Sequence, residues 1–358
     1  MNGYKRFITA VKRQEPDMVP IWELIINRPV IEALYGDISF LDFVEKEDLD
    51  GFTIFEDSKK ELINDRTYKD EWGIICKLEP NGILYPFDGP IKSYEDLKKY
   101  SLPDADSEYL YKTLNDAVKR FKGEKAIIFL AHETFEYSHS LSGGMDKLFV
   151  NYITAPDFVK ELAELIWTYK SKSIKNALEV GADAIVVGDD YAGRIGPLMS
   201  PEHFREFILP YLKKAVDLTH EHGSYLIKHS DGNLWKILDD IVNTGIDVLH
   251  PLEPLANMDI GKEKEKYGDR VCLAGNIDCT MILPMGTKEE VREAVKETIA
   301  KAAPGGGYIM ASSNSIHPGV NPENYKVMVE ATRRYGKYPI DEDLINEYKN
   351  KNYISKYI

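Results

Sequence analysis

Residues 181–190, GADAIVVGDD, contain the pattern that decides the fold. A helical segment ends at Gly181, the apolar run Ala184–Gly188 has the length of a strand, and two carboxylates follow it directly. Seven more apolar runs have this setting: Val19–Leu24, Gly51–Phe55, Ala126–Leu130, Ser224–Lys228, Asp247–His250, Val271–Ala274 and Gly307–Ala311. Continuous apolar strands that alternate with helices are typical of a parallel sheet covered on both faces. Eight such units predict an α/β protein with a (β/α)₈ TIM barrel rather than an open doubly wound sheet.

Three segments lie outside this repeat. The residues before the first strand predict an N-terminal helical extension. Residues 58–90 read as a β-hairpin insertion with Asn81-Gly82 as its turn, and Asp70-Glu71-Trp72-Gly73 lies on one of its arms. Residues 341–358 are polar and aromatic and are expected to pack on the outside or to fray. We therefore expect one barrel domain over residues 1–340, with the insertion at about 58–90 and a C-terminal tail at 341–358.

Composition excludes several classes of function. The chain has 358 residues with 45 Lys+Arg and 59 Asp+Glu, a net charge of −14, which argues against nucleic acid or an anionic membrane as the main partner. It has no Gly-x-Gly-x-x-Gly fingerprint, no phosphate-binding loop and no apolar run long enough for a signal peptide or a membrane span. Its three cysteines, Cys76, Cys272 and Cys279, are too scattered for a disulfide framework. We expect a cytoplasmic protein.

Polar residues follow the predicted strands at their carboxyl ends, where (β/α)₈ enzymes place their catalytic groups. Seven of the eight ends carry a histidine or an acid, and the eighth carries serine and asparagine. The residues at these ends are Glu23, Glu56, Asp57, His132, Glu133, Asp189, Asp190, His229, Ser230, Asp231, His250, Glu253, Asn276, Asp278, Ser312, Ser313 and Asn314. Loops are polar in any protein, but the histidines make this edge the predicted site.

The pattern His229-Ser230-Asp231 is the first candidate for chemistry. Its nitrogen and oxygen atoms could hold a borderline cation such as Zn²⁺, or form an acid/base pair with Glu253 of the next loop. A hydrogen-bonded cluster that only caps the loops is the structural alternative. Asp190 follows a fully apolar strand, so it lies near the cleft, where it either reacts or caps a loop.

Six motifs occur together in the second half of the chain. They are Gly181-Ala182-Asp183-Ala184, Asp190-Tyr191-Ala192-Gly193, Ser200-Pro201-Glu202-His203-Phe204, Leu209-Pro210-Tyr211-Leu212, Leu273-Ala274-Gly275-Asn276-Ile277-Asp278 and Pro322-Glu323-Asn324. As a set they resemble the uroporphyrinogen decarboxylase superfamily, a (β/α)₈ family that also contains corrinoid-dependent methyltransferases. The resemblance covers about residues 181–339 closely and the first half loosely.

Within that superfamily the decarboxylases are the less similar branch. They carry an arginine-rich N-terminal segment that binds a polycarboxylate, whereas residues 22–28 here, WELIINR, hold one arginine and a nearby glutamate. One arginine cannot neutralise an octa-acid, which a chain of charge −14 would also repel. Ser313-Asn314-Ser315 stands where the decarboxylases have a glycine-flanked histidine before the last helix.

The methyltransferase branch is more similar. Members that act on methanol, methylamine-derived or thiol methyl groups hold Zn²⁺ with a His-x-Cys pair and a later cysteine. Here His229 keeps the histidine, Asp231 replaces the first cysteine, and Asn314 stands in place of the second. This combination looks like that of O-demethylase methyltransferases, which act on the methyl donor. The resemblance implies transfer of a methyl group from a small aromatic methyl ether to the cob(I)alamin of a separate corrinoid protein, since this chain has no Asp-x-His-x-x-Gly cobalamin motif.

These implications give an expected site. The catalytic residues would be His229, Asp231, Glu253 and Asp190, which would protonate the ether oxygen or hold a Lewis-acid cation on it. If Zn²⁺ is bound, His229 and Asp231 would be two of its ligands, and the third would be Glu253, Asn314 or water. The substrate-binding residues would be Trp22, Glu23, Phe55, Glu133, Tyr137, Tyr191, Asn276 and Asn314. A tetrapyrrole decarboxylase and a non-catalytic protein that binds corrinoid partners remain the alternatives. Whether the chain forms a homodimer stays open.

Overall fold

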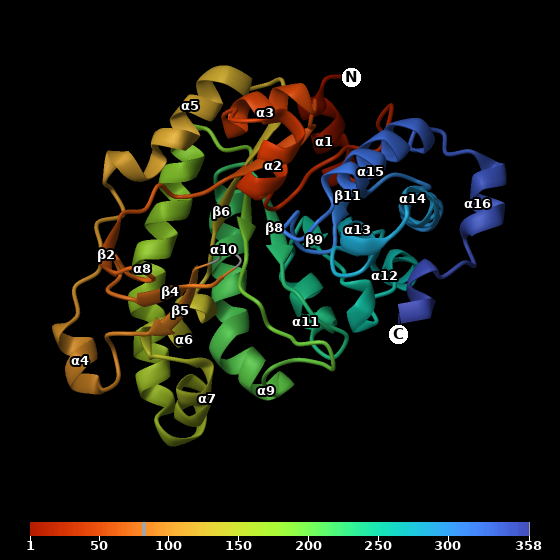
Figure 1. Cartoon of the computed structure of the whole chain (residues 1–358). Coiled ribbons are helices and arrows are strands. Elements are labelled where there is room, and N and C mark those ends of the chain that lie inside the picture. Colours follow the sequence, from red (N-terminus) through yellow and green to blue (C-terminus); the bar gives the residue numbers. More distant parts are fainter. Residues whose placement is uncertain (81–83, 358) are drawn as a thin grey trace.

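The computed structural model describes residues 1–80 and 84–357 and has a curled, parallel, seven-stranded sheet at its centre (Figure 1). The strand order is β1-β6-β7-β8-β9-β10-β11, so each strand lies beside the next one in the repeat. The bounds are β1 Gly51–Ile54, β6 Ala126–Ala131, β7 Ala184–Val187, β8 Tyr225–His229, β9 Val248–His250, β10 Cys272–Ile277 and β11 Tyr308–Ser312. Because all neighbours are parallel, their carboxyl ends share one edge.

The predicted strand Val19–Leu24 is not formed, so the prediction of eight strands is wrong by one. This segment still lies between β11 and β1, because Trp22 N–H donates to Met310 O (3.0 Å) and Ile21 O accepts from the N–H of Asp50 (3.1 Å). Two local features prevent a regular ladder. Pro20 has no N–H, and the N–H of Ile21 donates to the buried Asp50 carboxylate (2.8 Å) instead of to a strand. The segment nevertheless bridges the two edges of the sheet and gives a TIM-barrel-like fold.

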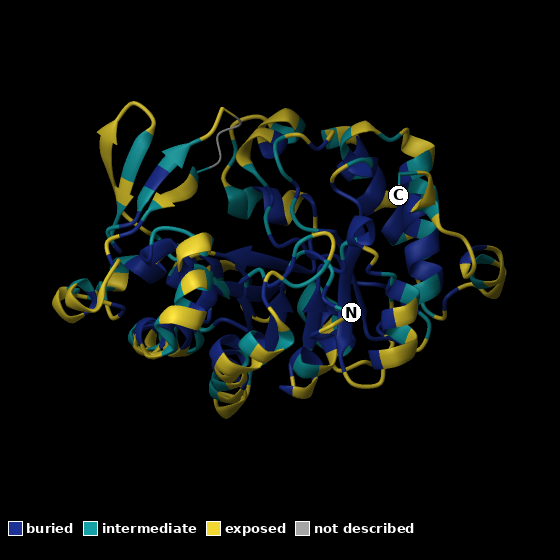
Figure 2. Cartoon of the chain, turned by 90° about the horizontal axis from the view of Figure 1, so that it is seen from below, coloured by how far each residue is buried: buried dark blue, intermediate teal, exposed yellow. Residues whose placement is uncertain are grey.

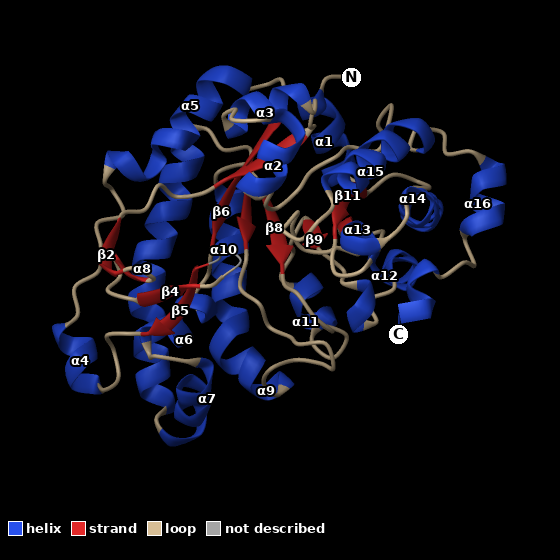
Figure 3. Cartoon of the chain, viewed as in Figure 1, coloured by secondary structure: helices blue, strands red, loops and turns tan. Residues whose placement is uncertain are grey.

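Helices cover the outside of the sheet (Figure 3). The longer helices pack on the sheet through an apolar face, as α8 does, and Gly181 ends α8, the longest of them, with a φ of 126°. The helices are α1 Gly3–Val11, α2 Arg28–Tyr35, α3 Phe40–Lys46, α4 Tyr94–Lys99, α5 Lys112–Phe121, α6 Phe135–Leu141, α7 Met145–Thr154, α8 Pro156–Val180, α9 Pro201–His203, α10 Leu209–Glu221, α11 Leu238–Asn243, α12 Ile260–Tyr267, α13 Ile282–Met285, α14 Lys288–Ala302, α15 Pro322–Tyr335 and α16 Glu342–Tyr348. Short helical turns span Glu108–Tyr111, Phe204–Ile208, Pro254–Ala256 and Tyr353–Tyr357.

The core has two layers. One fills the inside of the curled sheet and contains Phe7, Trp22, Ile128, Val186, Ile227, Cys272 and Ile309. The other lies between the strands and the surrounding helices. Figure 2 shows the strands buried at the centre and the exposed residues on the outer sides of the helices. The inner layer explains why the segment around Trp22 stays in place although it forms no regular strand, since the Trp22 side chain is fully buried there.

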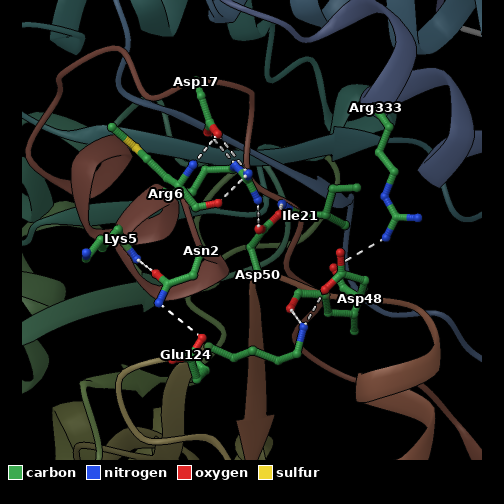
Figure 4. Close-up of polar contacts among 12 residues, drawn as sticks. Asn2, Lys5, Arg6, Asp17, Ile21, Asp48, Asp50, Glu124 and Arg333 are labelled. Atoms are coloured by element: carbon green, nitrogen blue, oxygen red, sulfur yellow. Dashed lines mark hydrogen bonds and ion pairs between the residues drawn. The ribbon is translucent and has the colours of Figure 1, made fainter.

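The amino-terminal face of the sheet is covered by α1 and tied by charged side chains (Figure 4). Arg6 Nη1 lies 2.5 Å from Asp50 Oδ1, and Arg6 Nε lies 2.7 Å from Asp17 Oδ1. The hydrogen bond from Arg6 holds the pKa of Asp17 at about 2, whereas burial raises the pKa of Asp50. Arg6 therefore fixes α1 to the start of β1.

The insertion is larger than the predicted hairpin. It is a four-stranded antiparallel sheet of β2 Lys60–Asn64, β3 Thr67–Asp70, β4 Ile75–Leu78 and β5 Leu84–Asp88. Asp70-Glu71-Trp72-Gly73 forms the turn between β3 and β4, where Ile74 N–H donates to Asp70 Oδ1 and Gly73 has a φ of 74°. Asn81-Gly82, the predicted turn, lies outside the described residues. Figure 2 shows this sheet at the upper left with exposed residues along its strands.

The C-terminal tail packs on the barrel rather than fraying. It forms α16 and the turn Tyr353–Tyr357, and Tyr353 N–H donates to Glu297 on α14 (2.7 Å). The Tyr353 hydroxyl also donates to Asn276 O at the end of β10 (2.7 Å). No helix in the described part of the chain has the length and the apolar character that a membrane span requires.

Candidate active site

Three ionisable side chains converge at the carboxyl ends of β7 and β8. His229 Nε2 lies 3.6 Å from Asp190 Oδ1 and 3.7 Å from Asp231 Oδ1, and all three ligand atoms are within 4.8 Å of one another. The register explains this meeting, because Val187 of β7 pairs with Lys228 of β8 and both chains then turn into loops at the same edge. We call Asp190, His229 and Asp231 the acidic cluster.

Backbone groups hold the acidic cluster in place. Asp231 N–H donates to Asp190 Oδ1 (2.8 Å), and Tyr191 N–H donates to Ser230 Oγ (2.9 Å). Gly232 follows with a φ of 83°, and a Cβ there would lie 2.5 Å from Ala192 O. Only glycine therefore allows the loop after β8 to approach the loop after β7 so closely.

The environment favours protons on the carboxyl groups. Burial raises the pKa of Asp190 to about 6, although its side chain keeps 40% of its surface accessible. Burial, followed by the charges of Asp190 and Glu253, raises the pKa of Asp231 well above its ordinary value. Burial lowers the pKa of His229, which keeps its imidazole neutral. Asp190 is therefore mostly ionised at pH 7, and Asp231 is the carboxyl group of the cluster whose surroundings favour a bound proton.

The same atoms also form a donor set for a divalent cation. One imidazole nitrogen and two carboxylate oxygens are ligands that Zn²⁺ accepts, and Asp231 Oδ1 is buried without a hydrogen-bond partner. The predicted ligand Glu253 is not in this group, so its role as a ligand stays a prediction. Its Oε2 instead accepts from Gly232 N–H (3.0 Å), and Asp190 takes its place among the described residues.

Asn314 lies beside the cluster, because its amide donates to Asp231 Oδ2. It thus reaches the histidine–aspartate pair, as its position in the sequence pattern predicts. Its amide binds one Asp231 oxygen and leaves Oδ1 to face His229.

His250, at the end of β9, is a site residue that the sequence reasoning left out of the expected set. Its Nδ1 lies 2.8 Å from Nδ1 of His229, the residue with which it pairs in the sheet register. Burial lowers the pKa of His250 to about 3. The sequence does show that His250 stands at the end of a predicted strand. Only the strand order shows that this end lies beside His229.

Glu133 and Tyr191 form a separate buried unit. Lys228 Nζ lies 2.9 Å from Glu133 Oε1, with neither side chain exposed, and the Tyr191 hydroxyl donates to the same oxygen. Lys228 also lies 3.7 Å from the centre of the Tyr191 ring. The structure therefore places these two predicted substrate-binding residues in a closed ion-pair network, and not among the cluster's side chains.

Three other predicted substrate-binding residues are also buried supports. Trp22 donates from its indole to Thr53 Oγ1 (3.0 Å) and packs edge-on against His250, with 4.8 Å between ring centres. Glu23 accepts from Ser312 N–H (2.9 Å) and Ser312 Oγ (2.6 Å), and burial raises its pKa to about 8. Asn276 donates to the carbonyl of Leu252 and so holds the loop after β9.

Tyr137 and Phe55 lie elsewhere around the barrel. Tyr137 packs 4.4 Å from Trp72 of the insertion, and its ring centre is 3.7 Å from Nζ of the buried Lys170. Phe55 follows β1, is 41% exposed and lines a pocket of about 310 Å³ together with Leu24, Ile26 and Phe40. This pocket lies at the carboxyl end of β1, on the same edge of the sheet as the cluster.

Comparison with known proteins agrees with this fold. The family model described as uroporphyrinogen decarboxylase (URO-D) matches residues 73–335. The chain is 26% identical to a uroporphyrinogen decarboxylase of Pseudoalteromonas atlantica, over 94% of this chain and 98% of that one, and 29% identical to one of Chlorobium phaeovibrioides, over 90% and 95%.

A solved methyltransferase from Methanosarcina mazei superposes with a TM-score of 0.68 at 18% identity, over 94% of this chain and 99% of that one. That identity supports the shared fold alone. The family match, by contrast, extends over most of the sequence, from the insertion to the last helix of the barrel. The chain therefore belongs to the uroporphyrinogen decarboxylase (URO-D) family.

Proposed function

We propose that this chain is a methyltransferase that moves the methyl group of a small aromatic methyl ether to the cob(I)alamin of a separate corrinoid protein. The observation that carries the proposal is the acidic cluster, in which Asp190, His229 and Asp231 meet at the barrel mouth and the pKa of Asp231 is raised well above its ordinary value. The family is enzymatic, and its fold is shared with a methyltransferase.

The reaction requires help for the leaving oxygen. The Co(I) centre of the partner supplies the electron pair that bonds to the methyl carbon. As the methyl–oxygen bond breaks, its electron pair stays on the oxygen, which becomes a poor alkoxide or phenoxide leaving group unless it receives a proton or a cation. Because its pKa is raised, Asp231 holds its proton to a higher pH than an ordinary aspartate does and can give it to that oxygen, an effect that typically contributes about 10²–10⁴-fold to a rate.

A divalent cation is the second way to meet the same requirement. His229 Nε2, Asp190 and Asp231 would hold it, and it would supply a Lewis acid for the ether oxygen. With the cation absent, a proton on Asp231 relieves the repulsion between its charge and that of Asp190. Elemental analysis of protein purified without chelators separates the two cases.

The donor fits an apolar pocket. The pocket that Phe55, Leu24 and Phe40 line has a volume of about 310 Å³, near the lower end of small-molecule sites, which begin at roughly 300 Å³. Its lining is mostly apolar, with Arg28, Glu56 and Asp57 as its charged members, and suits an aromatic ring that carries a polar group. A one-ring methoxyarene matches this size and polarity.

Decarboxylation of a tetrapyrrole is the second candidate, because the curated relatives carry that name. The charges at the mouth argue against it. Arg28, the only arginine of residues 22–28, already binds Glu32 (2.7 Å) and Asp37. The net charge of −14 also disfavours the binding of a polycarboxylate.

One assay set tests the proposal. The protein is incubated with reduced corrinoid protein and a panel of methoxyarenes, and the methylated corrinoid is followed by absorbance and the free phenol by chromatography. We expect both products with wild-type protein and neither with His229→Ala or Asp231→Ala. No spectral change across the panel would sink the proposal, and CO₂ release from uroporphyrinogen would replace it with decarboxylation. A binding protein without catalysis would retain corrinoid-protein affinity in the wild type and both variants and would form no phenol.

A further inference from the structure

A short hairpin projects from the loop after β7, directly beside the acidic cluster. Gly193 N–H donates to Gly196 O (2.9 Å), and Gly196 N–H donates back to Gly193 O (3.3 Å). Ala192 and Pro197 pair next to them as an antiparallel bridge. We call residues 192–197 the rim hairpin. It begins two residues after the first carboxylate of the cluster, so it belongs to the wall of the candidate active site.

Two further hydrogen bonds tie the rim hairpin to the loops after β8 and β9. Asn233 N–H, after β8, donates to Gly193 O (2.9 Å). Arg194 Nε, at the tip, donates to Leu255 O after β9 (3.0 Å). The backbone of the tip is therefore fixed relative to the three strand ends that surround the cluster.

The tip presents an apolar side chain to solvent. Ile195 is 97% exposed, more than any other large apolar residue in the described part of the chain, and Leu198 beside the hairpin is also exposed. Single apolar residues on a protein surface are common and need no explanation by themselves. Here the backbone beneath Ile195 is already fixed, so a partner that covers it would pay little conformational entropy. A rigid apolar anchor of this kind suits a pocket on another protein.

Two cations lie on the same loops. Arg194 stands at the tip and Lys236 follows β8, and neither forms an ion pair with a carboxylate in the part of the chain that the structure describes. The chain as a whole carries a net charge of −14. An acidic surface that approached this rim would therefore meet free cations, which most other parts of the surface do not offer.

The reaction of the proposed function defines what has to cover this rim. The Co(I) centre must approach the methyl carbon in line with the methyl–oxygen bond, and the ether oxygen lies at the acidic cluster. The protein that carries the corrinoid must then contact the loops around the cluster. Among these loops, the rim hairpin is the one that ends in an exposed apolar tip.

We propose that the rim hairpin is the docking element for the corrinoid protein, with Ile195 as its apolar anchor. This inference rests on the proposed function, because it takes its partner from that reaction. The surface that fits on the corrinoid protein is an apolar pocket for Ile195, with acidic groups around it that face Arg194 and Lys236.

Two methyl acceptors separate docking from chemistry. Free cob(I)alamin reaches the cluster without a protein surface, whereas a corrinoid protein has to dock. The corrinoid protein is purified from the host cells by its cobalamin absorbance and reduced to the Co(I) state. Ile195→Asp places a charge at the tip, and Ile195→Leu keeps the tip apolar. Leu62→Asp is the matched control, since Leu62 is also exposed (58%) but lies on β2, an edge strand of the insertion.

With a methoxyarene as the donor, we expect Ile195→Asp to raise KM for the corrinoid protein about 10–100-fold and to leave the rate with free cob(I)alamin unchanged. Ile195→Leu and Leu62→Asp should behave like the wild type with both acceptors. The Kd of the corrinoid protein for each variant, measured by isothermal titration calorimetry, should change in step with KM. Thermal unfolding shows that each variant is folded.

The inference is overturned by a folded Ile195→Asp variant that keeps the wild-type KM and Kd for the corrinoid protein. It is also overturned by equal losses with both acceptors, since the tip would then act on the chemistry. If the wild type methylates neither acceptor, the proposed reaction fails and the Kd values alone judge the inference. Tighter binding by the wild type than by Ile195→Asp then supports docking at the rim hairpin, and equal or absent binding refutes it.

Discussion

The backbone N–H of Asp231 donates a 2.8 Å hydrogen bond to Asp190 Oδ1, so that the loops after two adjacent strands hold their carboxyl groups together. The charge of Asp190 then raises the pKa of Asp231, in addition to the larger effect of burial. The raised pKa of Asp231 thus follows from burial together with strand order and a close loop contact. This relationship leads to the first prediction.

Asp231→Asn should lower methyl-transfer kcat by about 100-fold or more, since it removes the acid that protonates the leaving oxygen. In metal-free wild-type protein, kcat should fall as pH rises through the raised pKa of Asp231, because only its protonated form donates. Asp190→Asn should move this alkaline limb to lower pH, because it removes a like charge. Rates from pH 5 to 9 measure both effects.

Asp217→Asn is the control for these variants, since it removes only a surface partner of Lys213 on α10. An Asp190→Asn profile that coincides with the wild-type profile would show that the two carboxyl groups do not interact.

Phe55→Ala should raise KM for a methoxyarene by about 10-fold with little change in kcat, because the ring contributes binding that is equal in the ground and transition states. Phe87→Ala is a matched control, since Phe87 is 51% exposed on the insertion, away from this pocket. Steady-state kinetics of both variants and the wild type measure KM and kcat. Equal KM values for Phe55→Ala and wild type would place the aryl ring elsewhere.

Glu23 should make folding stability depend on pH. Its pKa is about 8 in the folded protein against an ordinary value of 4.5, so the folded state binds the extra proton between these values. Stability is therefore fully present below about pH 4.5 and is lost as pH rises to about 8, by at most about 1.4 kcal/mol per pH unit. Glu23→Gln keeps an acceptor for Ser312 N–H and removes the titration.

Urea unfolding at pH 5, 6.5 and 8 should then show a flatter dependence for Glu23→Gln and a higher stability than wild type at pH 8. The two proteins would have parallel pH dependences if Glu23 titrated normally.

Asp50→Ala should lower the free energy of unfolding by about 3 kcal/mol, because it leaves the Arg6 guanidinium and the Ile21 N–H without their buried partner. Lys99→Ala, which removes an exposed ion pair with Glu95 on α4, should change it by less than about 0.5 kcal/mol. Denaturant titrations of both variants provide the comparison. Similar losses in the two would show that the Arg6–Asp50 pair does not hold α1 on the sheet.

The helices and most strands could be predicted because their signal is local. The run Ala184–Gly188 and the apolar face of α8 need only short windows of sequence. The strand prediction for Val19–Leu24 was wrong because the hydrogen bonding of this segment depends on Asp50. The Asp50 carboxylate, 29 residues further along the chain, accepts from the Ile21 N–H. The insertion has four strands instead of the two of a hairpin. Asp70–Gly73, which the sequence reading placed on one arm, forms a turn between β3 and β4.

The sequence by itself determined the alternation of strands and helices and the position of His229 and Asp231 at one strand's end, since both follow from adjacent residues. Only the tertiary structure decided that Asp190, and not Glu253, joins them, and that His250 pairs with His229. It also turned Glu133 toward Lys228 and away from the cluster's side chains. The physical reason is that these contacts depend on strand order, register and loop approach, which link residues that are distant in the chain and leave no trace in local spacing.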